Sequence, residues 1–135
     1  MTINLALEGR TLPPTVPYTV GVEKIREFAR AVFAGDTTGA VAPPTFAIVI
    51  QQLTLDQLLD DPDVGIDFSK VVHGDQHFVY SRTIVPGDEL TGQLTVTSVK
   101  SLGGNAMITA DTVVTDRDGA HVVTATSTLV VRGGD

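Results

Sequence analysis

The chain has 135 residues, enough for one domain with a single core and too few for two domains of ordinary size. Sixteen acidic against nine basic residues give a net charge of −7, and the basic residues are scattered, which argues against a nucleic-acid partner. Without cysteine there are no disulfides and no thiolate chemistry. We see no leader-like start and no run of about 18 apolar residues. One domain over residues 1–135, cytoplasmic and not in a membrane, is therefore the expectation.

Two helices are predicted in the first half of the chain. Apolar residues in 22–33 recur at the three- and four-residue spacing of an amphipathic surface helix, which Gly35 is expected to end. A second helix is predicted from about Pro44 to Leu59, because prolines are tolerated in a first helical turn. Its first turns are apolar on all sides and should be buried. Gln51 and Gln52 are interpreted as the point where this helix emerges from the core.

Strands are predicted from Val71 onward. The segments "VVHGDQHFVY", "ELTGQLTVTSVKSL", "AMITADTVVTD" and "AHVVTATSTLVVR" are rich in β-branched residues with near-alternating polarity. The last three are separated by "GGN" and "RDG", which are typical of hairpin turns. The segment "PYTV" near the N-terminus is expected to add an edge strand. Helices followed by a run of strands indicate an α+β fold, with one antiparallel sheet packed around the apolar helix.

Polar side chains at alternating positions mark the first of these strands. Residues four apart on a strand are separated by about 13 Å, so His73 and His77 are not expected to share a zinc ion. Residues two apart are separated by about 7 Å, so Asp75 is within reach of either His73 or His77 for an acid–base dyad. The alternative is a structural or interface role for all three residues. Strict alternation places four others on the opposite, helix-facing side of the strand: Gly74, Gln76, Phe78 and Tyr80.

Four segments together resemble a known family: "APPTF", "VVHGDQHFVYSRTIVPGDEL", "SVKSLGGNAMIT" and "DGAHVVTATSTLVV". They are similar to the MaoC-like (3R)-hydroxyacyl-thioester dehydratases, in particular to the actinobacterial branch and the non-catalytic subunits of the mycobacterial hydroxyacyl-ACP dehydratase. The resemblance implies a hot-dog fold, a curved antiparallel sheet wrapped around a central helix. It further implies a dimer with an acyl-thioester tunnel near the subunit interface, acyl-CoA or acyl-ACP as ligand, and neither a cofactor nor a metal.

Two motif positions depart from the catalytic members of that family. Those members use an Asp and a His from a motif of the type D-x-N-P-x-H before the central helix, whereas "AGDTTGAVAPPTF" offers Asp36 and no histidine precedes His73. Catalytic relatives also have a His-Gly pair at the helix start, so that a backbone N–H faces the thioester oxygen. This chain has Pro43 and Pro44 there, and proline has no N–H to donate.

The chain is therefore expected to be an acyl-thioester-binding subunit that lacks the Asp-His motif and forms a homodimer, or a heterodimer with a hot-dog subunit that bears it. Two alternatives stay open. One is a homodimeric hydratase or acyl thioesterase that uses Asp75 with His73, or Asp36 as a single carboxylate. The other is a non-enzymatic binding protein. The candidate substrate-binding residues are Pro44, Thr45, Gln76, Tyr80 and Arg82.

Overall fold

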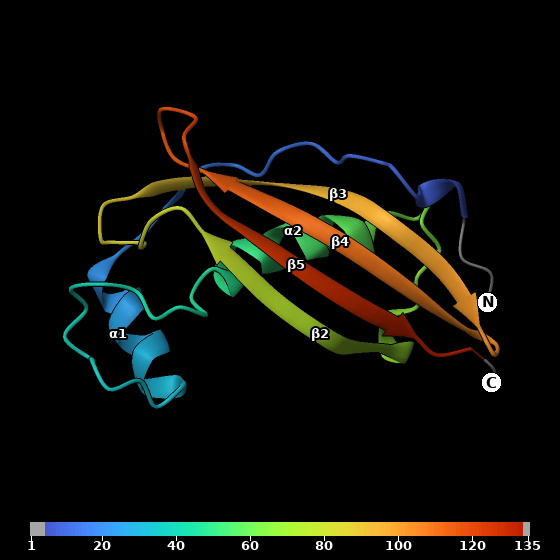
Figure 1. Cartoon of the computed structure of the whole chain (residues 1–135), viewed down its shortest axis with the longest axis horizontal. Helices are drawn as coiled ribbons and strands as arrows, with labels where there is room; N and C mark the ends of the chain where they lie inside the picture. Colours follow the sequence, from blue (N-terminus) through green and yellow to red (C-terminus); the bar gives the residue numbers. More distant parts are fainter. Residues whose placement is uncertain (1–4, 134–135) are drawn as a thin grey trace.

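The computed structural model describes residues 5–133. Its elements, in chain order, are η1 (Leu5–Leu7), β1 (Tyr18–Thr19), α1 (Val22–Ala31), α2 (Ile48–Asp60), η2 (Phe68–Lys70), β2 (Val71–Tyr80), β3 (Glu89–Leu102), β4 (Asn105–Thr115) and β5 (His121–Val131). A long, curved sheet lies against α2 on one face, and α1 lies beyond one end of the sheet (Figure 1). The predicted α+β arrangement, a curved antiparallel sheet around an apolar helix, is confirmed.

The sheet has one covered edge and one open edge. Its strand order is β1-β3-β4-β5-β2, with every neighbouring pair antiparallel. The chain before β1 follows the outer edge of β3, where the N–H of Leu12 donates to Leu94 O at 2.9 Å and that of Thr15 to Gly92 O at 2.8 Å. At the other edge, β2 pairs with β5 and, within residues 5–133, with no further strand.

Two apolar clusters fill the space between α2 and the sheet. Phe46, Ala47 and Ile50 belong to the cluster at the α1 end, and Leu55 and Leu58 to the cluster at the far end. Between them, the side chains of α2 that face the sheet are polar and fully buried. They belong to Gln51 and Thr54, opposite the buried Thr112 and Ser127 of the sheet.

The helix packs tightly against the sheet at Gly92 on β3. A Cβ atom at this position would lie 2.9 Å from Ile50 Cγ2 and 3.1 Å from Thr54 Cγ2, so only glycine leaves room for the helix. At the same level the hydroxyls of Thr54 and Thr112 are hydrogen-bonded at 2.7 Å, which satisfies two buried polar groups.

Helix α1 ends differently from the prediction. Gly35 does not end it. Instead Phe33 adopts a left-handed conformation with φ 57, and the N–H of Ala34 donates to Ala29 O at 2.9 Å, which is the pattern of a Schellman motif. The Phe33 side chain is 93% exposed. A phenylalanine thus occupies a backbone position that normally favours glycine.

The start of α2 also differs from the prediction. The helix begins at Ile48 and not at Pro44, because residues 43–47 form turns with three-residue hydrogen bonds such as Phe46 N to Pro43 O at 2.9 Å. The interpretation of Gln51 as an emerging residue is wrong. Gln51 is completely buried because it faces β5, where its Nε2 donates to Ala125 O, whereas Gln52 is exposed.

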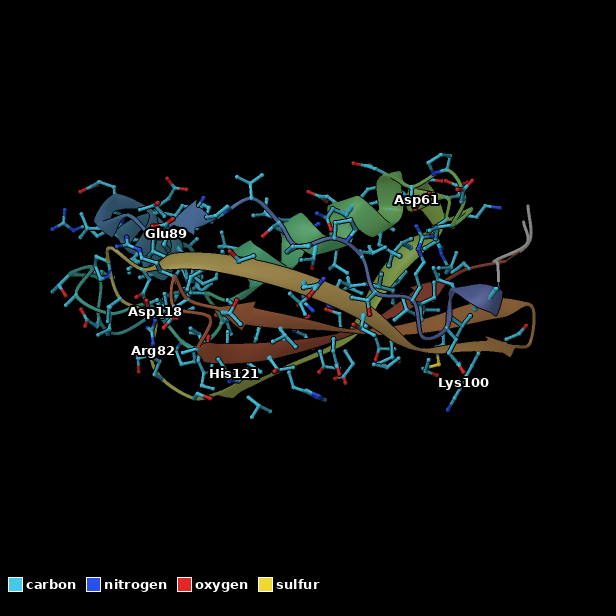
Figure 2. All side chains as sticks on the ribbon, turned by 90° about the horizontal axis from the view of Figure 1, so that it is seen from above. Asp61, Arg82, Glu89, Lys100, Asp118 and His121 are labelled. Carbon is cyan, nitrogen blue, oxygen red and sulfur yellow. The ribbon has the colours of Figure 1, made fainter. Side chains whose placement is uncertain are left out.

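The two ends of the molecule carry different side chains. Figure 2 shows Arg82, Glu89, Asp118 and His121 at the α1 end of the sheet, and Asp61 and Lys100 at the opposite end. Across residues 5–133, the helices are too short or too polar to cross a bilayer.

Candidate functional site

Two adjoining hollows open at the start of α2, and we call them together the helix-start groove. The larger, about 410 Å³, is mainly apolar, and the smaller, about 210 Å³, contains Asp36. The larger is lined by Val41, Ala42, Pro44, Tyr80, Thr83 and Ile84, and the smaller by Ala34, Gly35, Asp36, Val41, Ala42, Pro43 and Pro44. An apolar cleft with a few polar groups is the usual form of a small-molecule site.

Tyr80, the last residue of β2, supplies the polar group of the larger hollow. Its hydroxyl donates a hydrogen bond to the carbonyl oxygen of Pro44. Burial raises the pKa of the Tyr80 hydroxyl above its usual value, an effect that the Ala47 N–H opposes. Tyr80 is therefore a neutral phenol that occupies the Pro44 carbonyl just before α2.

The loop of residues 34–42 folds back on α1. Arg26 Nε donates to Thr38 O at 2.9 Å, and a Cβ on Gly39, whose φ is +85, would lie 2.7 Å from Val22 Cγ2. Asp36 Oδ1 accepts from Thr38 Oγ1 at 2.7 Å and from Thr38 N at 2.9 Å. These two bonds hold the pKa of the Asp36 carboxyl below its usual value, so Asp36 is ionised at neutral pH.

A bulge in β2 changes the predicted arrangement of His73 and Asp75. The register shifts between them: His73 lies opposite Leu129 and Asp75 opposite Thr128, so Gly74 is an extra residue. Because Leu129 is a buried core residue, His73 lies on the helix-facing side, while Asp75 lies on the outer side. The prediction that strict alternation puts both on one face is wrong.

The outer side of β2 therefore pairs Asp75 with His77 instead. Asp75 Oδ2 lies 3.9 Å from His77 Nδ1, too far for a hydrogen bond, and both side chains are more than 60% exposed. Among the described residues no three histidine, aspartate or glutamate side chains gather as a metal site would require. A catalytic role for Asp75 or His73 stays a prediction. The two side chains lie on opposite faces of β2, so such a role cannot depend on a dyad between them.

Gln76 lies in a hydrogen-bonded group on the helix-facing side of β2. Its Oε1 accepts from His73 Nε2 at 2.9 Å and from the hydroxyl of Ser127, the residue opposite it on β5. Two positions along β5 from Ser127, the Ala125 carbonyl accepts from the buried Gln51. Within residues 5–133, Gln51 Oε1 is buried and has no hydrogen-bond partner.

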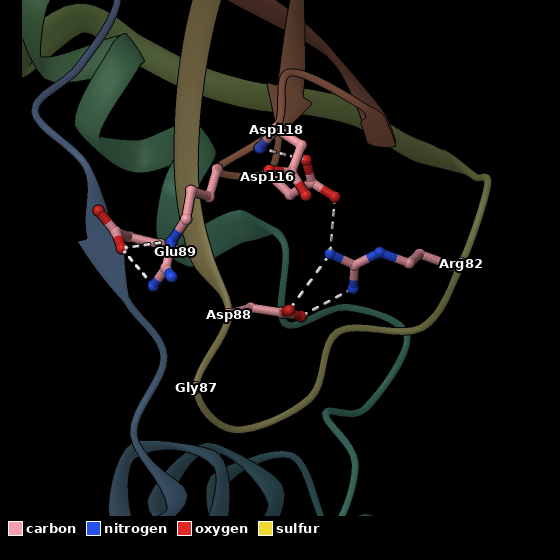
Figure 3. A pocket seen from close by; sticks show the side chains of 7 residues that line it. Arg82, Gly87, Asp88, Glu89, Asp116 and Asp118 are labelled. Carbon is pink, nitrogen blue, oxygen red and sulfur yellow. Dashed lines mark hydrogen bonds and ion pairs between the residues drawn. The ribbon is translucent and has the colours of Figure 1, made fainter.

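Arg82 lies in a separate, polar pocket of about 250 Å³ formed by the turns at the α1 end of the sheet (Figure 3). Its guanidinium is 2.8 Å from Asp88 Oδ2 and 3.4 Å from Asp116 Oδ2. The hydrogen bond to Asp88 raises the pKa of the Arg82 guanidinium above its usual, already high value. Because two carboxylates already neutralise this guanidinium, the geometry lends no support to the prediction that Arg82 binds substrate.

The other candidate residues fall in and beside the groove. Pro44 and Tyr80 line it, as a substrate-binding role requires, whereas Thr45 is exposed and does not line either hollow. Sequence reasoning had singled out Asp36 and Pro43, which line the smaller hollow, but it missed the other lining residues and Ser127. Apolar residues such as Val41 and Ile84 carry no chemical signal in the sequence, and Tyr80 meets Pro44 across 36 positions of the chain. Gly74 within a strand was a usable signal for the bulge.

A comparison with protein families matches residues 6–125 to the model described as "FAS1-like, dehydratase domain region". The chain is 58% identical to a UPF0336 protein of Leifsonia xyli subsp. xyli, with 98% of each chain covered. That alignment extends over 146 positions, more than the 135 residues of this chain, so the relative has residues without a counterpart here.

Two solved structures with similar sequences share the fold. One is the C-terminally truncated HadBC (3R-hydroxyacyl-ACP dehydratase) complex of Mycobacterium tuberculosis, with a TM-score of 0.76, 31% identity, and coverage of 92% of this chain and 96% of that chain. The other is a MaoC-like dehydratase, with a TM-score of 0.77, 29% identity, and coverage of 96% of this chain and 43% of that chain. These matches confirm the hot-dog fold that the sequence resemblance implied.

Proposed function

Because the chain belongs to the FAS1-like dehydratase domain family, we propose that it is an acyl-thioester-binding hot-dog subunit of a (3R)-3-hydroxyacyl-thioester dehydratase or enoyl hydratase. In this proposal the helix-start groove binds the thioester end of acyl-CoA or acyl-ACP, and a second hot-dog subunit supplies the Asp-His motif. The HadBC complex, to which this chain is similar, is itself an assembly of this type of enzyme.

The observation that carries the proposal is the chemistry at the start of α2. Stabilising a thioester oxygen as it gains charge requires hydrogen-bond donors aimed at it. Pro43 and Pro44 have no N–H, and the N–H of Phe46 is used by the Pro43 carbonyl at 2.9 Å. The Tyr80 hydroxyl donates to Pro44 O, so the groove offers space and apolar surface for an acyl thioester, while its two prolines supply no backbone donor.

The acid–base chemistry points in the same direction. Asp36 is the carboxylate of the groove, and its lowered pKa makes it a weak acceptor for a carbon-bound proton. No histidine lines either hollow. We propose that the residues present in the longer relative and missing here belong to the loop of residues 34–42, where catalytic members carry their motif.

The open edge of β2 supports a paired assembly. A ten-residue edge strand presents unpaired backbone groups, and covering them with another subunit removes a template for aggregation. The opposite edge of the sheet is already covered by the chain before β1. We therefore expect sedimentation to show a dimer or a larger even assembly at micromolar concentration, and a stable monomer would contradict this.

Hydration of crotonyl-CoA tests the assignment. The isolated chain should turn over at least about 10²-fold more slowly than a competent relative, since loss of a single oxyanion donor has about this effect. Activity should appear on adding a hot-dog subunit that carries the Asp-His motif. Robust turnover by the chain alone, lost in Asp75→Asn while the protein stays folded, would overturn the proposal.

A second candidate function, a thioesterase with Asp36 as its carboxylate, rests on the position of Asp36 in the groove. It predicts hydrolysis of acyl-CoA that Asp36→Asn abolishes. Asp67→Asn is a matched control, because Asp67 Oδ1 accepts from Ser69 N at 3.0 Å and Ser69 Oγ at 2.7 Å in the same local geometry. The proposed subunit role predicts no hydrolysis in the wild type and no difference between these two variants.

A further inference from the structure

The carboxamide of Gln76 is held in one orientation by two neighbours. Gln76 Oε1 is an acceptor only, so His73 Nε2 must donate to it, at 2.9 Å, and Ser127 Oγ donates to it from β5. Ser127 is completely buried, and Gln76 is half-buried. With both donors directed at its oxygen, the amide cannot rotate without breaking two hydrogen bonds.

The bulge at Gly74 is what makes this arrangement possible. In a regular strand, residues three apart point to opposite faces, so the side chains of His73 and Gln76 would not meet. The extra residue returns His73 to the helix-facing side, where it reaches Gln76. Bulges commonly redirect a side chain next to a functional site.

The fixed oxygen leaves the amide nitrogen as a directed donor. Gln76 Nε2 carries two hydrogens, and its one hydrogen bond, to His77 O, is long at 3.4 Å. The surroundings are polar as well, because Gln51 approaches the same stretch of β5 and its buried Oε1 lacks a partner within residues 5–133. A buried polar group without a partner is costly, and a water or ligand group commonly satisfies it.

Gln76 also lies in line with the groove. It shares the helix-facing side of β2 with Phe78 and Tyr80, whose rings are 6.3 Å apart, and it is four residues from Tyr80, about 13 Å along the strand. A ligand whose thioester lies at Tyr80 and which extends along β2 therefore passes the Phe78 ring before it reaches the Gln76 amide.

We propose that Gln76 Nε2 donates a hydrogen bond to an oxygen of the bound thioester about 13 Å from its reacting carbonyl. His73 and Ser127 are positioning residues that aim this amide. The inference rests on the proposed function and adds to it a second polar anchor. The acceptor is an oxygen in the pantetheine arm, which contains amide carbonyls, or a hydroxyl on the acyl chain.

Calorimetric titration of the full chain, or of its complex with a partner subunit, tests this anchor. Gln76→Met keeps the size of the side chain and removes the donor. It should weaken binding about fivefold for a ligand that carries the acceptor, which is crotonyl-CoA if the acceptor lies in the pantetheine arm and 10-hydroxydecanoyl-CoA if it lies on the acyl chain. Gln76→Glu keeps an acceptor for His73 and Ser127 but replaces the donor with a charged acceptor, and it should weaken binding more. His73→Leu should weaken binding less than Gln76→Met does. His73→Gln retains an N–H and should restore the affinity of the wild type.

Shortened ligands identify the acceptor. If it lies in the pantetheine arm, crotonyl-N-acetylcysteamine, which lacks the distal part of that arm, should bind wild type and Gln76→Met equally. If it lies on the acyl chain, Gln76→Met should bind 10-hydroxydecanoyl-CoA more weakly than the wild type does, and the two should bind decanoyl-CoA equally. Either pattern supports the anchor, and a purely structural role for Gln76 produces neither.

Equal affinity of wild type and variants for all four ligands would overturn the inference and leave the proposed function standing. Failure of the wild type to bind any of them would overturn both. If Gln76→Met changes the sedimentation coefficient and leaves affinity untouched, the amide serves a subunit contact and not a ligand.

Discussion

At the far end of α2, the cluster around Leu55 and Leu58 is closed over by the N-terminal segment, whereas at the α1 end the cluster around Phe46 and Ile50 continues into apolar surface. Leu7 and Leu12 of the N-terminal segment are buried in the first cluster. At this end Phe33, just after α1, is 93% exposed, and Val41, which is 42% exposed, lines the helix-start groove. The closed end stabilises the fold, and the open end has apolar surface left over for binding.

The largest expected effect is at the open end, from Ile50→Asp. Ile50 is fully buried in the α1-end cluster, and a buried charge without a partner should destabilise the fold by more than about 4 kcal/mol. Far-UV circular dichroism should show a largely unfolded chain. Leu53→Asp is the control on the same helix, because Leu53 is 39% exposed, and this variant should fold. Equal behaviour of the two would contradict the burial described for α2.

The closed end is probed by Leu58→Ala, which should lower the free energy of unfolding by about 2–5 kcal/mol. The chain has no tryptophan, and both tyrosines, Tyr18 and Tyr80, pack against the other cluster. Tyrosine fluorescence therefore reports on the open end and circular dichroism on the whole chain. We expect both signals to shift together in urea, because the clusters belong to one cooperative unit. Separate transitions would show that the two ends unfold independently.

The junction between the ends is tested by Gly92→Ala. The added methyl would lie 2.9 Å from Ile50 Cγ2 and 3.1 Å from Thr54 Cγ2, so the helix must move away from the sheet. We expect a loss of about 1–3 kcal/mol in urea denaturation. Gly35→Ala is the matched control, since nothing lies within 4 Å of a Cβ there. A neutral Gly92→Ala would mean that the spacing between α2 and β3 is not set by this contact.

A smaller change of opposite sign is expected from Phe33→Gly at the open end. A non-glycine residue in the left-handed conformation is strained, so glycine at φ 57 should stabilise the fold by about 1 kcal/mol. The side chain is exposed, so little packing is lost. Weaker crotonyl-CoA binding in this more stable variant would indicate that Phe33 serves the groove, whereas a lower melting temperature would contradict the strain.

The smallest effect concerns Arg82. Burial opposes ionisation of Asp88, but bonds from Arg82 and the Val85 N–H outweigh it and hold the Asp88 pKa below its usual value. The pKa of Asp116 is lowered first by the Ala120 N–H and further by Arg82. The stability from these carboxylates is present above about pH 4 and is lost as pH falls through the lower folded values. Arg82→Met should therefore lower the urea midpoint slightly at pH 7, and the difference should shrink toward pH 2.

The control for Arg82 is Arg117→Met. Arg117 pairs with Glu89 at 2.8 Å, but its side chain is 73% exposed, so solvent screens the pair. This variant should leave the midpoint unchanged at every pH. If the urea midpoint of Arg82→Met fell further below that of the wild type as the solution is acidified, this would contradict the lowered pKa values of Asp88 and Asp116.

Most of the fold could be predicted from the sequence because its signals are local. The apolar spacing of residues 22–33 indicated α1, observed over Val22–Ala31. The turns at Gly103-Gly104 and Gly119, all with positive φ, separate β3, β4 and β5 as the hairpin signals suggested. The short edge strand at Tyr18–Thr19 was likewise confirmed. These features depend on neighbours within a few residues.

The site was less predictable because its contacts join residues that are far apart in the sequence. They also depend on one shift in the register of β2. Alternation alone cannot tell that Gly74 is an extra residue, and that single shift separates His73 from Asp75 and joins it to Gln76. The burial of Gln51 depends on β5, 74 positions away, which supplies the Ala125 carbonyl. Residue type suggested which side chains to consider, but only the register shows which of them meet.

The covered edge of β3 bears on how large an assembly this chain can form. Sheets with two free edges can add strands at both sides and grow without limit, as fibrils do. Here the backbone groups along β3 are occupied by the residues that precede β1, with bonds such as Gly9 N to Val96 O at 2.7 Å. Pairing through β2 uses the other edge of the sheet that residues 5–133 form, so a sheet that grows in this way stops after a single addition.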